Sequence, residues 1–248
     1  MPGTMLKDQH WSKLKSIFRN FRIYLKQNLR NFIEAILYRI RTGCPWRDLP
    51  TEFGKSNSIF KKYCRWSADN KFMKIFKLFS NHADKEWIFI DGSHIRAHQH
   101  SAGIKNQDIS KSIGGNSSKI HLAVDADGNP IEVIISDGTT HDVKVAPDLV
   151  SKLDLNSTET LCADKGYDSE TLREQIKKTK THANIPRKSN TQLNNDHMDW
   201  HLYKIRHLVE NTFARLKQFR GIATRYDKLK RNYQSAVALA CIFIWSPL

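Results

Sequence analysis

The sequence is poor in cysteine. Its four cysteines, Cys44, Cys64, Cys162 and Cys241, lie far apart and form no CxxC pair. Zinc ribbons need closely spaced cysteine pairs, and disulfide-stapled domains need a much higher density of cysteines. The sequence therefore argues against both classes and predicts a protein of a reducing cytoplasm.

Long apolar runs are also missing. The longest run without a charged residue covers residues 233–248, and its apolar part is too short to cross a bilayer. We expect this run to form a buried helix at the end of the chain. The first residues, MPGTMLKDQHW, contain no apolar stretch like that of a signal peptide. No membrane partner is expected.

Acidic residues are scarce relative to basic ones. The 248 residues include 40 lysines and arginines but only 25 aspartates and glutamates, which gives a net charge of +15. An excess of this size is typical of proteins that bind a polyanion, and nucleic acid is favoured over a membrane surface. Apolar residues make up 40% of the chain, which is enough for one large domain or two smaller ones.

Helical periodicity dominates the chain up to about residue 80. Apolar residues recur at helical spacing in residues 6–18 and 32–40, and Gly43 and Pro45 are expected to end the second helix. A turn-rich segment follows, and Ser56 is the predicted N-cap of the next helix. The outer face of that helix carries Asn57, Lys61, Lys62 and Arg65.

Helix, tight turn and helix with a basic outer face is the pattern of a helix-turn-helix DNA reader. A small helical bundle with a solvated basic face fits the same pattern equally well. Residues 1–82 are therefore predicted to form a helical domain. The four polar residues of its third helix are candidate DNA contacts, and the pattern alone leaves both alternatives open.

The pattern changes at Trp87. WIFID, residues 87–91, is a short apolar run suited to a buried strand, and residues 118–138 predict a hairpin around a DGNP turn. Amphipathic helices and short apolar strands then alternate along the chain. A hairpin followed by alternating strands and helices predicts an α/β domain with a mixed sheet in residues 83–248.

Two of the predicted strands end in aspartate. WIFID ends in Asp91, and ETLCAD ends in Asp164. A carboxylate at the end of a buried strand is costly unless it is paired, protonated or bound to a metal, and ligands of α/β sheets tend to lie at strand ends. Two such aspartates could share a divalent ion, and oxygen ligands favour magnesium or manganese. The alternative is a cap or turn role, which suits Asp164 because KGYDSE follows it.

A third carboxylate stands in the basic segment YKIRHLVENTFARLK, residues 203–217. At about 100° per residue, Glu210 shares one narrow stripe of a continuous helix with Tyr203, Arg206 and Lys217, next to an apolar stripe that can pack on the sheet. Glu210 is then expected near the strand ends. Ion pairing between Arg206 and Glu210 is the simpler explanation, but it leaves Tyr203 and Lys217 unexplained.

Carboxylates that hold two metal ions, beside basic residues that hold the phosphate backbone, are the arrangement that phosphodiester chemistry requires. The spacing Tyr, two residues, Arg, three, Glu, six, Lys resembles the signature of DDE transposases from bacterial insertion sequences, in the insertion-sequence-five group. TGCPWRDLP, VDADGNP, ADKGYDS, GIATRYDKLKRNY and the pair His141 and Asp142 also resemble that family in the expected order. The resemblance covers nearly the whole chain.

The resemblance implies an RNase H-like catalytic domain in which Asp91, Asp164 and Glu210 bind two magnesium ions, with manganese as an alternative. It implies that the helical domain binds the terminal inverted repeats of the element. Cleavage at the element's end is expected to expose a 3′-hydroxyl that attacks target DNA. Arg206 and Lys217 are expected to hold phosphates, with Tyr203 stacked on a base or positioning the scissile strand.

Double-stranded DNA is then the partner, both as element end and as target. Because two ends must be brought together, a homodimer or a larger assembly on DNA is expected. The implied location is the bacterial cytoplasm, in association with the nucleoid. Two rivals remain: an inactive relative that only occupies DNA, against which the intact triad argues, and a structure-specific nuclease of the same fold that transfers no strand.

Three histidines and an arginine follow Asp91 in the segment HIRAHQH. The histidines His94, His98 and His100 keep no ligand spacing with a cysteine or an acidic residue, so a zinc site is disfavoured. We expect them instead, together with Arg96, to border DNA beside the first aspartate.

Overall fold

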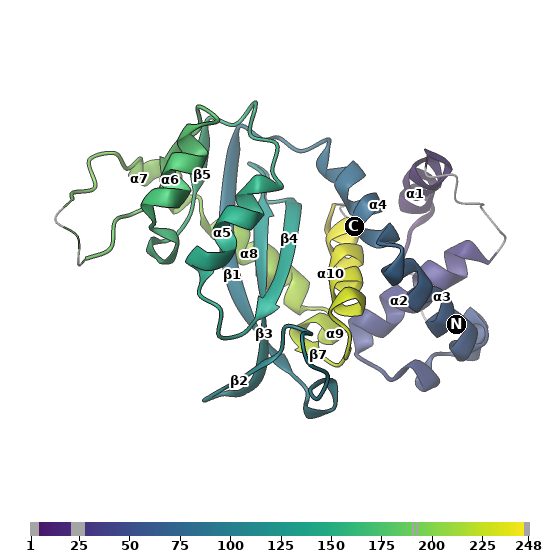
Figure 1. Ribbon diagram of the computed structural model, residues 1–248. Coiled ribbons are helices and arrows are strands. Elements are labelled where there is room, and N and C mark those ends of the chain that lie inside the picture. Colours follow the sequence, from purple (N-terminus) through teal and green to yellow (C-terminus); the bar gives the residue numbers. More distant parts are fainter. Residues whose placement is uncertain (1–4, 21–27, 190, 192, 246–248) are drawn as a thin grey trace.

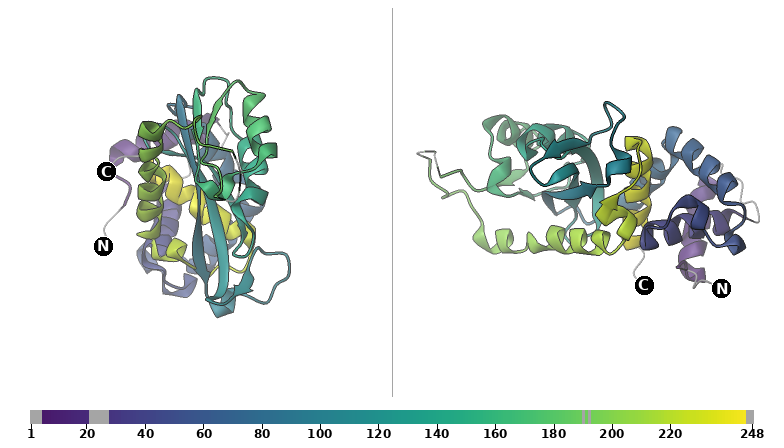
Figure 2. Two further views of the ribbon diagram at one scale, coloured as in Figure 1. Left: turned by 90° about the vertical axis from the view of Figure 1, so that its left-hand side faces the viewer. Right: turned by 90° about the horizontal axis from the view of Figure 1, so that it is seen from below.

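The computed structural model describes residues 5–20, 28–189, 191 and 193–245 (Figure 1). A mixed sheet with helices on both faces forms one part of the molecule, and the N-terminal helices pack beside it. Seen from below in Figure 2, the last helix of the chain lies between these two parts.

The N-terminal part is helical, as predicted. Its elements are α1 (Asp8–Asn20), α2 (Leu29–Thr42), the 3-10 turns η1 (Trp46–Asp48) and η2 (Thr51–Phe53), α3 (Ser56–Ala68) and α4 (Lys71–Ser80). The end of α2 is where the sequence predicts it. Gly43 adopts left-handed backbone at φ 73°, and its N–H donates to the carbonyl of Arg39 at 2.8 Å.

The start of α3 and its connection to α2 differ from the prediction. Ser56 is the first helical residue rather than the N-cap, because the carbonyl of Lys55 already accepts bonds from the N–H groups of Ser58 and Ile59. Residues 43–55, all within the described part of the chain, form two 3-10 turns instead of one tight turn. The helix-turn-helix assignment therefore stays a prediction.

The central strand of the sheet is β1 (Trp87–Ala97). It pairs antiparallel with β3 (Gly115–Val124), which in turn pairs antiparallel with β4 (Pro130–Asp137). On its other side β1 runs parallel to β5 (Thr160–Cys162), which runs parallel to β6 (His182–Asn184). The order is β4-β3-β1-β5-β6, with β3 antiparallel to the other four strands. This is the RNase H-like arrangement, and it confirms the predicted α/β fold with a mixed sheet.

Each face of the sheet is covered by its own pair of helices. These are α5 (Asp142–Ser151) and α6 (Glu170–Lys177) on one face, and α8 (His207–Lys217) and α10 (Lys230–Ile244) on the other. Because side chains alternate along a strand, Ile88 and Ile90 of β1 are buried against the first pair and Phe89 against the second. The same alternation decides which face Asp91 points to.

The last helix, α10, joins the two parts of the molecule. It packs on β4 and on the N-terminal helices α2, α3 and α4, within one continuous apolar cluster. The buried terminal helix predicted for residues 233–248 is present as far as Ile244, and residues 246–248 lie outside the described residues. The predicted boundary between residues 82 and 83 falls in the link between α4 and β1. No helix in the described ranges is long and apolar enough to cross a membrane.

The smaller elements are β2 (Ser110–Ser112), β7 (Thr224–Arg225), α7 (Trp200–Lys204), α9 (Arg220–Ala223), η3 (Gln99–Ser101) and η4 (Lys165–Tyr167). Within β7, Arg225 is fully buried. Its guanidinium donates to the carbonyls of Gln107 at 2.8 Å, Asp108 at 3.2 Å and Asp227 at 3.1 Å, and to Ser118 Oγ at 2.8 Å. These bonds tie the loop before β2 to the segment RYDKLKRNY, which gives that segment a structural role.

Replacing Arg225 by lysine should lower the free energy of unfolding by about 2–4 kcal/mol, because an ammonium group cannot reach carbonyls on two separate segments and leaves some of them buried and unpaired. Urea unfolding measures the change. Arg231→Lys, at an exposed position of α10, is the control and should shift the free energy by less than about 0.5 kcal/mol. Equal effects of the two substitutions would show that the buried bonds contribute little.

Candidate active site

Asp91 lies where the buried part of β1 meets solvent. Two residues beyond Phe89, it points to the same face of the sheet, toward α8. Its Oδ1 accepts a bond from the N–H of Gly92 at 2.7 Å. Burial raises the pKa of Asp91, and the nearby charge of Asp164 raises it further. The bond from the Gly92 N–H and the Arg206 guanidinium offset these effects only in part.

Asp164 lies near Asp91, two residues beyond the end of the neighbouring parallel strand β5. The pairing of β1 with β5 places Cys162 opposite Phe89, so the residue two positions further along each chain is an aspartate. The carboxylate of Asp164 also accepts a bond from the N–H of Gly166 at 2.8 Å, where it caps η4. The cap role considered from the sequence is therefore present, and the two aspartates lie close enough for their charges to interact. Neither of them ends its strand as predicted, because β1 continues past Asp91 to Ala97 and β5 ends at Cys162, two residues before Asp164.

The segment that carries Glu210 is not the single continuous helix that the sequence predicts. It is divided into α7 and α8 at Ile205 and Arg206. At this joint the N–H of Ile205 donates to the carbonyl of Leu202, and that of Arg206 to the carbonyl of Tyr203, so the bonds span three residues instead of four. The tighter turn changes the angular position of α7, and the assumption of 100° per residue fails across it.

The predicted side chains of this segment nevertheless meet at β1. The guanidinium of Arg206 donates to Asp91 Oδ2 at 3.0 Å and to Glu210 Oε1 at 2.5 Å. Further along α8, Lys217 Nζ donates to Ser93 Oγ at 2.7 Å. The ring of Tyr203 lies 5.9 Å from the Arg206 guanidinium. The simple pairing of Arg206 with Glu210 is thus one half of a bridge between α8 and the central strand.

A hollow of about 310 Å³ lies between α8 and β1. It is lined by Asp91, Gly92, Ser93, Glu210, Phe213, Ala214 and Lys217. The carboxylates of two predicted metal ligands and the amine of Lys217 therefore face one space, large enough for part of a nucleotide chain.

Carboxylate oxygens are suitable ligands for a divalent cation, but these carboxylates are not arranged around a common point. Within the described ranges no three histidine, cysteine or acidic side chains converge closely enough to hold a metal ion. A cation does bridge two of the carboxylates, but it is the guanidinium of Arg206. Although burial alone lowers it, the pKa of Arg206 is raised by the charges of Asp91 and Glu210. The site is rich in negative charge, as a cation site requires.

The other predicted DNA contacts lie apart from these carboxylates. Asn57, Lys61, Lys62 and Arg65 are on α3, at the far end of the molecule from β5 (Figure 1). Among these four side chains, Lys62 packs on an aromatic ring: its ammonium group lies 4.2 Å from the centre of the Phe32 ring. Arg96 is exposed on β1 but alternates to the opposite face from Asp91, so the two side chains are not brought together.

Sequence reasoning missed a polar network behind Gly92. Asp142 stands in the first turn of α5, and its carboxylate pairs with Lys119 Nζ at 2.6 Å and lies 3.3 Å from Nδ1 of the buried His121. His121 bonds through Nε2 to Ser136 Oγ at 2.8 Å. Burial lowers the pKa of His121 to about 4. The pair His141 and Asp142, one of the family segments, is the signal that could have pointed to it.

This network leaves no space for a side chain at Gly92. A Cβ there would lie 2.5 Å from Asp142 Oδ1, 2.9 Å from Lys119 Cε and 3.2 Å from His121 Nδ1. Because the N–H of Gly92 holds the Asp91 carboxylate, the packing behind the strand also fixes the carboxylate in front of it.

Gly92→Ala should therefore lower the free energy of unfolding by about 1–3 kcal/mol through overpacking of the ion-paired network. Gly114→Ala is the matched control, because the nearest atom to its Cβ, Ser112 Oγ, is 3.9 Å away, and it should cost less than about 0.5 kcal/mol. Thermal or urea unfolding of both variants gives the comparison. A Gly92→Ala variant as stable as the control would mean that the network rearranges around the added methyl group without loss of stability.

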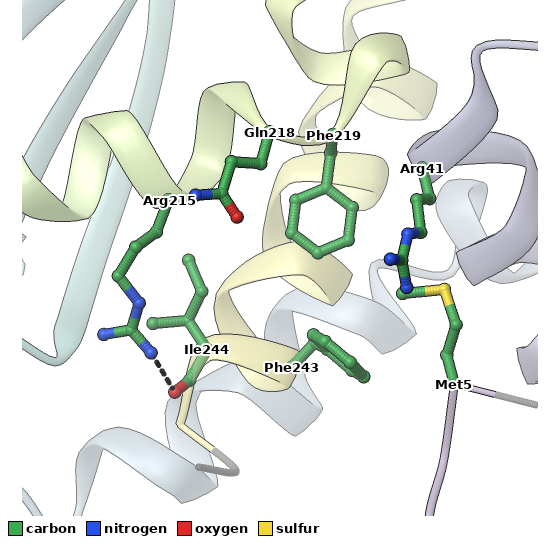
Figure 3. Close-up of a pocket in the computed structure, with 7 residues that line it drawn as sticks. All are labelled: Met5, Arg41, Arg215, Gln218, Phe219, Phe243 and Ile244. Atoms are coloured by element: carbon green, nitrogen blue, oxygen red, sulfur yellow. Dashed lines mark hydrogen bonds between the residues drawn. The ribbon is translucent and has the colours of Figure 1, made fainter. Parts of the chain in front are cut away.

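A second hollow, of about 260 Å³, lies where α8 and α10 approach the N-terminal part (Figure 3). It is lined by Met5, Arg41, Arg215, Gln218, Phe219, Phe243 and Ile244. The guanidinium of Arg215 donates to the carbonyl of Ile244 at 3.0 Å and so binds the end of α10. This hollow shares no lining residue with the one beside Asp91.

Comparison with known proteins places the whole arrangement in a family. Residues 82–245 match the family of the transposase DDE domain, and residues 6–76 match a family described as putative transposases of the IS4/5 family.

Individual relatives agree with these matches. The chain is 33% identical over 138 residues to a putative transposase for insertion sequence element IS6501 from Brucella ovis, an alignment that covers 52% of this chain and 97% of that protein. It is 31% identical over 103 residues to the uncharacterized protein y4sN of Sinorhizobium fredii, which covers 40% of this chain and 82% of that one.

A structure of piggyBac transposase in a synaptic complex with hairpin DNA is similar with a TM-score of 0.39 and 13% identity, over 76% of this chain and 50% of that one. At this TM-score and identity the two structures are only weakly similar. The family match covers most of the chain by itself, and the protein therefore belongs to the transposases with a DDE domain.

Proposed function

We propose that this protein binds the terminal inverted repeats of an insertion sequence and catalyses DNA cleavage and strand transfer at them. The observation that carries the proposal is the meeting of Asp91 and Glu210 on one guanidinium, with Asp164 close by after the neighbouring strand β5. Membership of the transposase family supports the reaction class. The net charge of +15 supports a DNA partner.

Asp91, Asp164 and Glu210 are the proposed ligands of two magnesium ions, for which manganese can substitute. Bound there, the ions would act as Lewis acids toward the phosphate and lower the pKa of the attacking hydroxyl group. The chain itself orients the ligands. The Gly92 N–H fixes one oxygen of Asp91, and the Gly166 N–H fixes one oxygen of Asp164. The second oxygen of Asp91 accepts the bond from Arg206.

Arg206 and Lys217 are proposed to hold phosphates of the scissile strand. Lys217 is exposed in the hollow, and its bond to the Ser93 hydroxyl is weak compared with an ion pair to a phosphate. Tyr203 is proposed to stack on a base next to the cut, because its ring lies beside the Arg206 guanidinium.

End recognition is assigned to the N-terminal part. Residues 1–82 are proposed to form the DNA-binding domain and residues 83–248 the catalytic domain. The outer face of α3, with Asn57, Lys61, Lys62 and Arg65, would contact the terminal repeat, and Arg96 would contact DNA on the far face of β1. Since an element has two ends, a homodimer or a larger assembly on DNA is proposed as the active form.

Glu210→Gln should reduce nicking of terminal DNA by about a hundredfold or more, because it removes a charge worth several kcal/mol to the transition state. The substrate is a linear duplex copied from the DNA that flanks the gene, incubated with magnesium and resolved on a denaturing gel. Glu174→Gln, at an exposed position of α6, is the matched control and should cut at the wild-type rate.

Joining of a pre-cut 3′-end to a plasmid separates the rival functions. Wild-type protein should give joined product. Hydrolysis without joining would favour a nuclease, and binding without hydrolysis would favour an inactive DNA-binding relative. Nicking by Glu210→Gln at the wild-type rate would overturn the assignment of Glu210.

A further inference from the structure

The guanidinium of Arg206 occupies the space between the carboxylates of the central strand and of α8. It donates to Asp91 Oδ2 at 3.0 Å and to Glu210 Oε1 at 2.5 Å. The side chain is only 18% exposed, while those of Asp91 and Glu210 are 21% and 54% exposed. Arg206 is therefore held inside the site rather than in solvent, where a DNA phosphate would meet it.

A divalent ion and this guanidinium need the same oxygens. Magnesium binds carboxylate oxygens at about 2.0–2.1 Å and demands octahedral geometry around it. An ion placed between Asp91 and Glu210 would lie where the two guanidinium nitrogens now lie, and two cations in one space repel each other strongly.

We propose, on the basis of the metal-dependent function proposed above, that Arg206 is an internal counter-ion that the metal displaces. Without metal it neutralises Asp91 and Glu210 and holds α8 on β1. When a metal takes over these carboxylates, the long side chain turns away and its charge is free for a DNA phosphate. Arg206 stands at the joint between α7 and α8, as the N-cap residue of α8.

Metal and DNA should then strengthen each other's binding. Metal releases the arginine that DNA needs, and DNA withdraws the arginine that competes with metal. Binding linkage requires the two effects to be equal in size. A positioning arginine that only supported the fold would produce neither effect.

The test is the affinity for Mn²⁺ without DNA, measured on the full chain by isothermal titration calorimetry. Arg206→Gln removes the competing charge and should bind Mn²⁺ about tenfold more tightly than the wild type. Arg206→Lys keeps the charge, so the fold is supported, but one ammonium group cannot bridge both carboxylates as the guanidinium does. It should also bind Mn²⁺ more tightly than the wild type, by a smaller factor.

Arg215→Gln is the matched control. It removes an arginine from α8, the helix that follows Arg206, and the partner of Arg215 is the carbonyl of Ile244 instead of a carboxylate (Figure 3). Its Mn²⁺ affinity should equal that of the wild type. Saturating duplex DNA should tighten Mn²⁺ binding to the wild type and to Arg215→Gln, but not to Arg206→Gln.

Unchanged or weaker Mn²⁺ binding by both Arg206 variants would overturn the counter-ion role. A gain shared by Arg215→Gln would also overturn it, because the effect would then be one of overall charge. If no form of the protein, wild type included, bound Mn²⁺ with or without DNA, the proposed function itself would fail. Failure of the inference and failure of the function are thus distinguishable.

Discussion

The bridge from Arg206 to Asp91 and Glu210 is the contact on which the candidate site depends. Asp91 ends a run of fully buried strand residues, and burial disfavours its charge. A carboxylate in that position needs a cation, and Arg206, 115 residues further along the chain at the joint between α7 and α8, supplies one. The bridge therefore holds α8 on the sheet, and its two carboxylates line the hollow together with Lys217. The same contact therefore sets the position of α8 and balances the charge of the two carboxylates.

Packing behind the central strand is as important as the bridge in front of it. Gly92 exposes its backbone to the ion pair of Lys119 and Asp142 on one side, while its N–H holds Asp91 on the other. The strand β1 thus separates the ion pair of Lys119 and Asp142 on one face of the sheet from the Asp91 carboxylate on the other. The shared apolar cluster under α10 then joins this sheet to the N-terminal helices, so α3 and α8 are related by side-chain packing and not merely by the link after α4.

Much of the fold could be predicted because local patterns carry it. The apolar run before Asp91, the DGNP hairpin and the glycine after α2 each specify an element through burial or backbone conformation. The break at Ile205 and Arg206 could not be predicted, because the apolar periodicity continues across it and no glycine or proline marks it. The predicted start of α3 was wrong by one residue, because the backbone carbonyl of Lys55 and not a side chain begins the helix.

The sequence by itself determined which residue types are available: two apolar runs that each lead to an aspartate, one glutamate in a basic helical segment, and a large excess of positive charge. These follow from short-range patterns, since strand burial and helix spacing act over a few residues. Only the tertiary structure decided that Asp91 and Asp164 are neighbours, because this requires β5 to pair in parallel with β1 in one particular register. It also decided that Arg206 bridges Asp91 and Glu210, because the contact depends on how α8 packs across the sheet. Pairing and packing join residues far apart in the chain, and no local pattern encodes their distances.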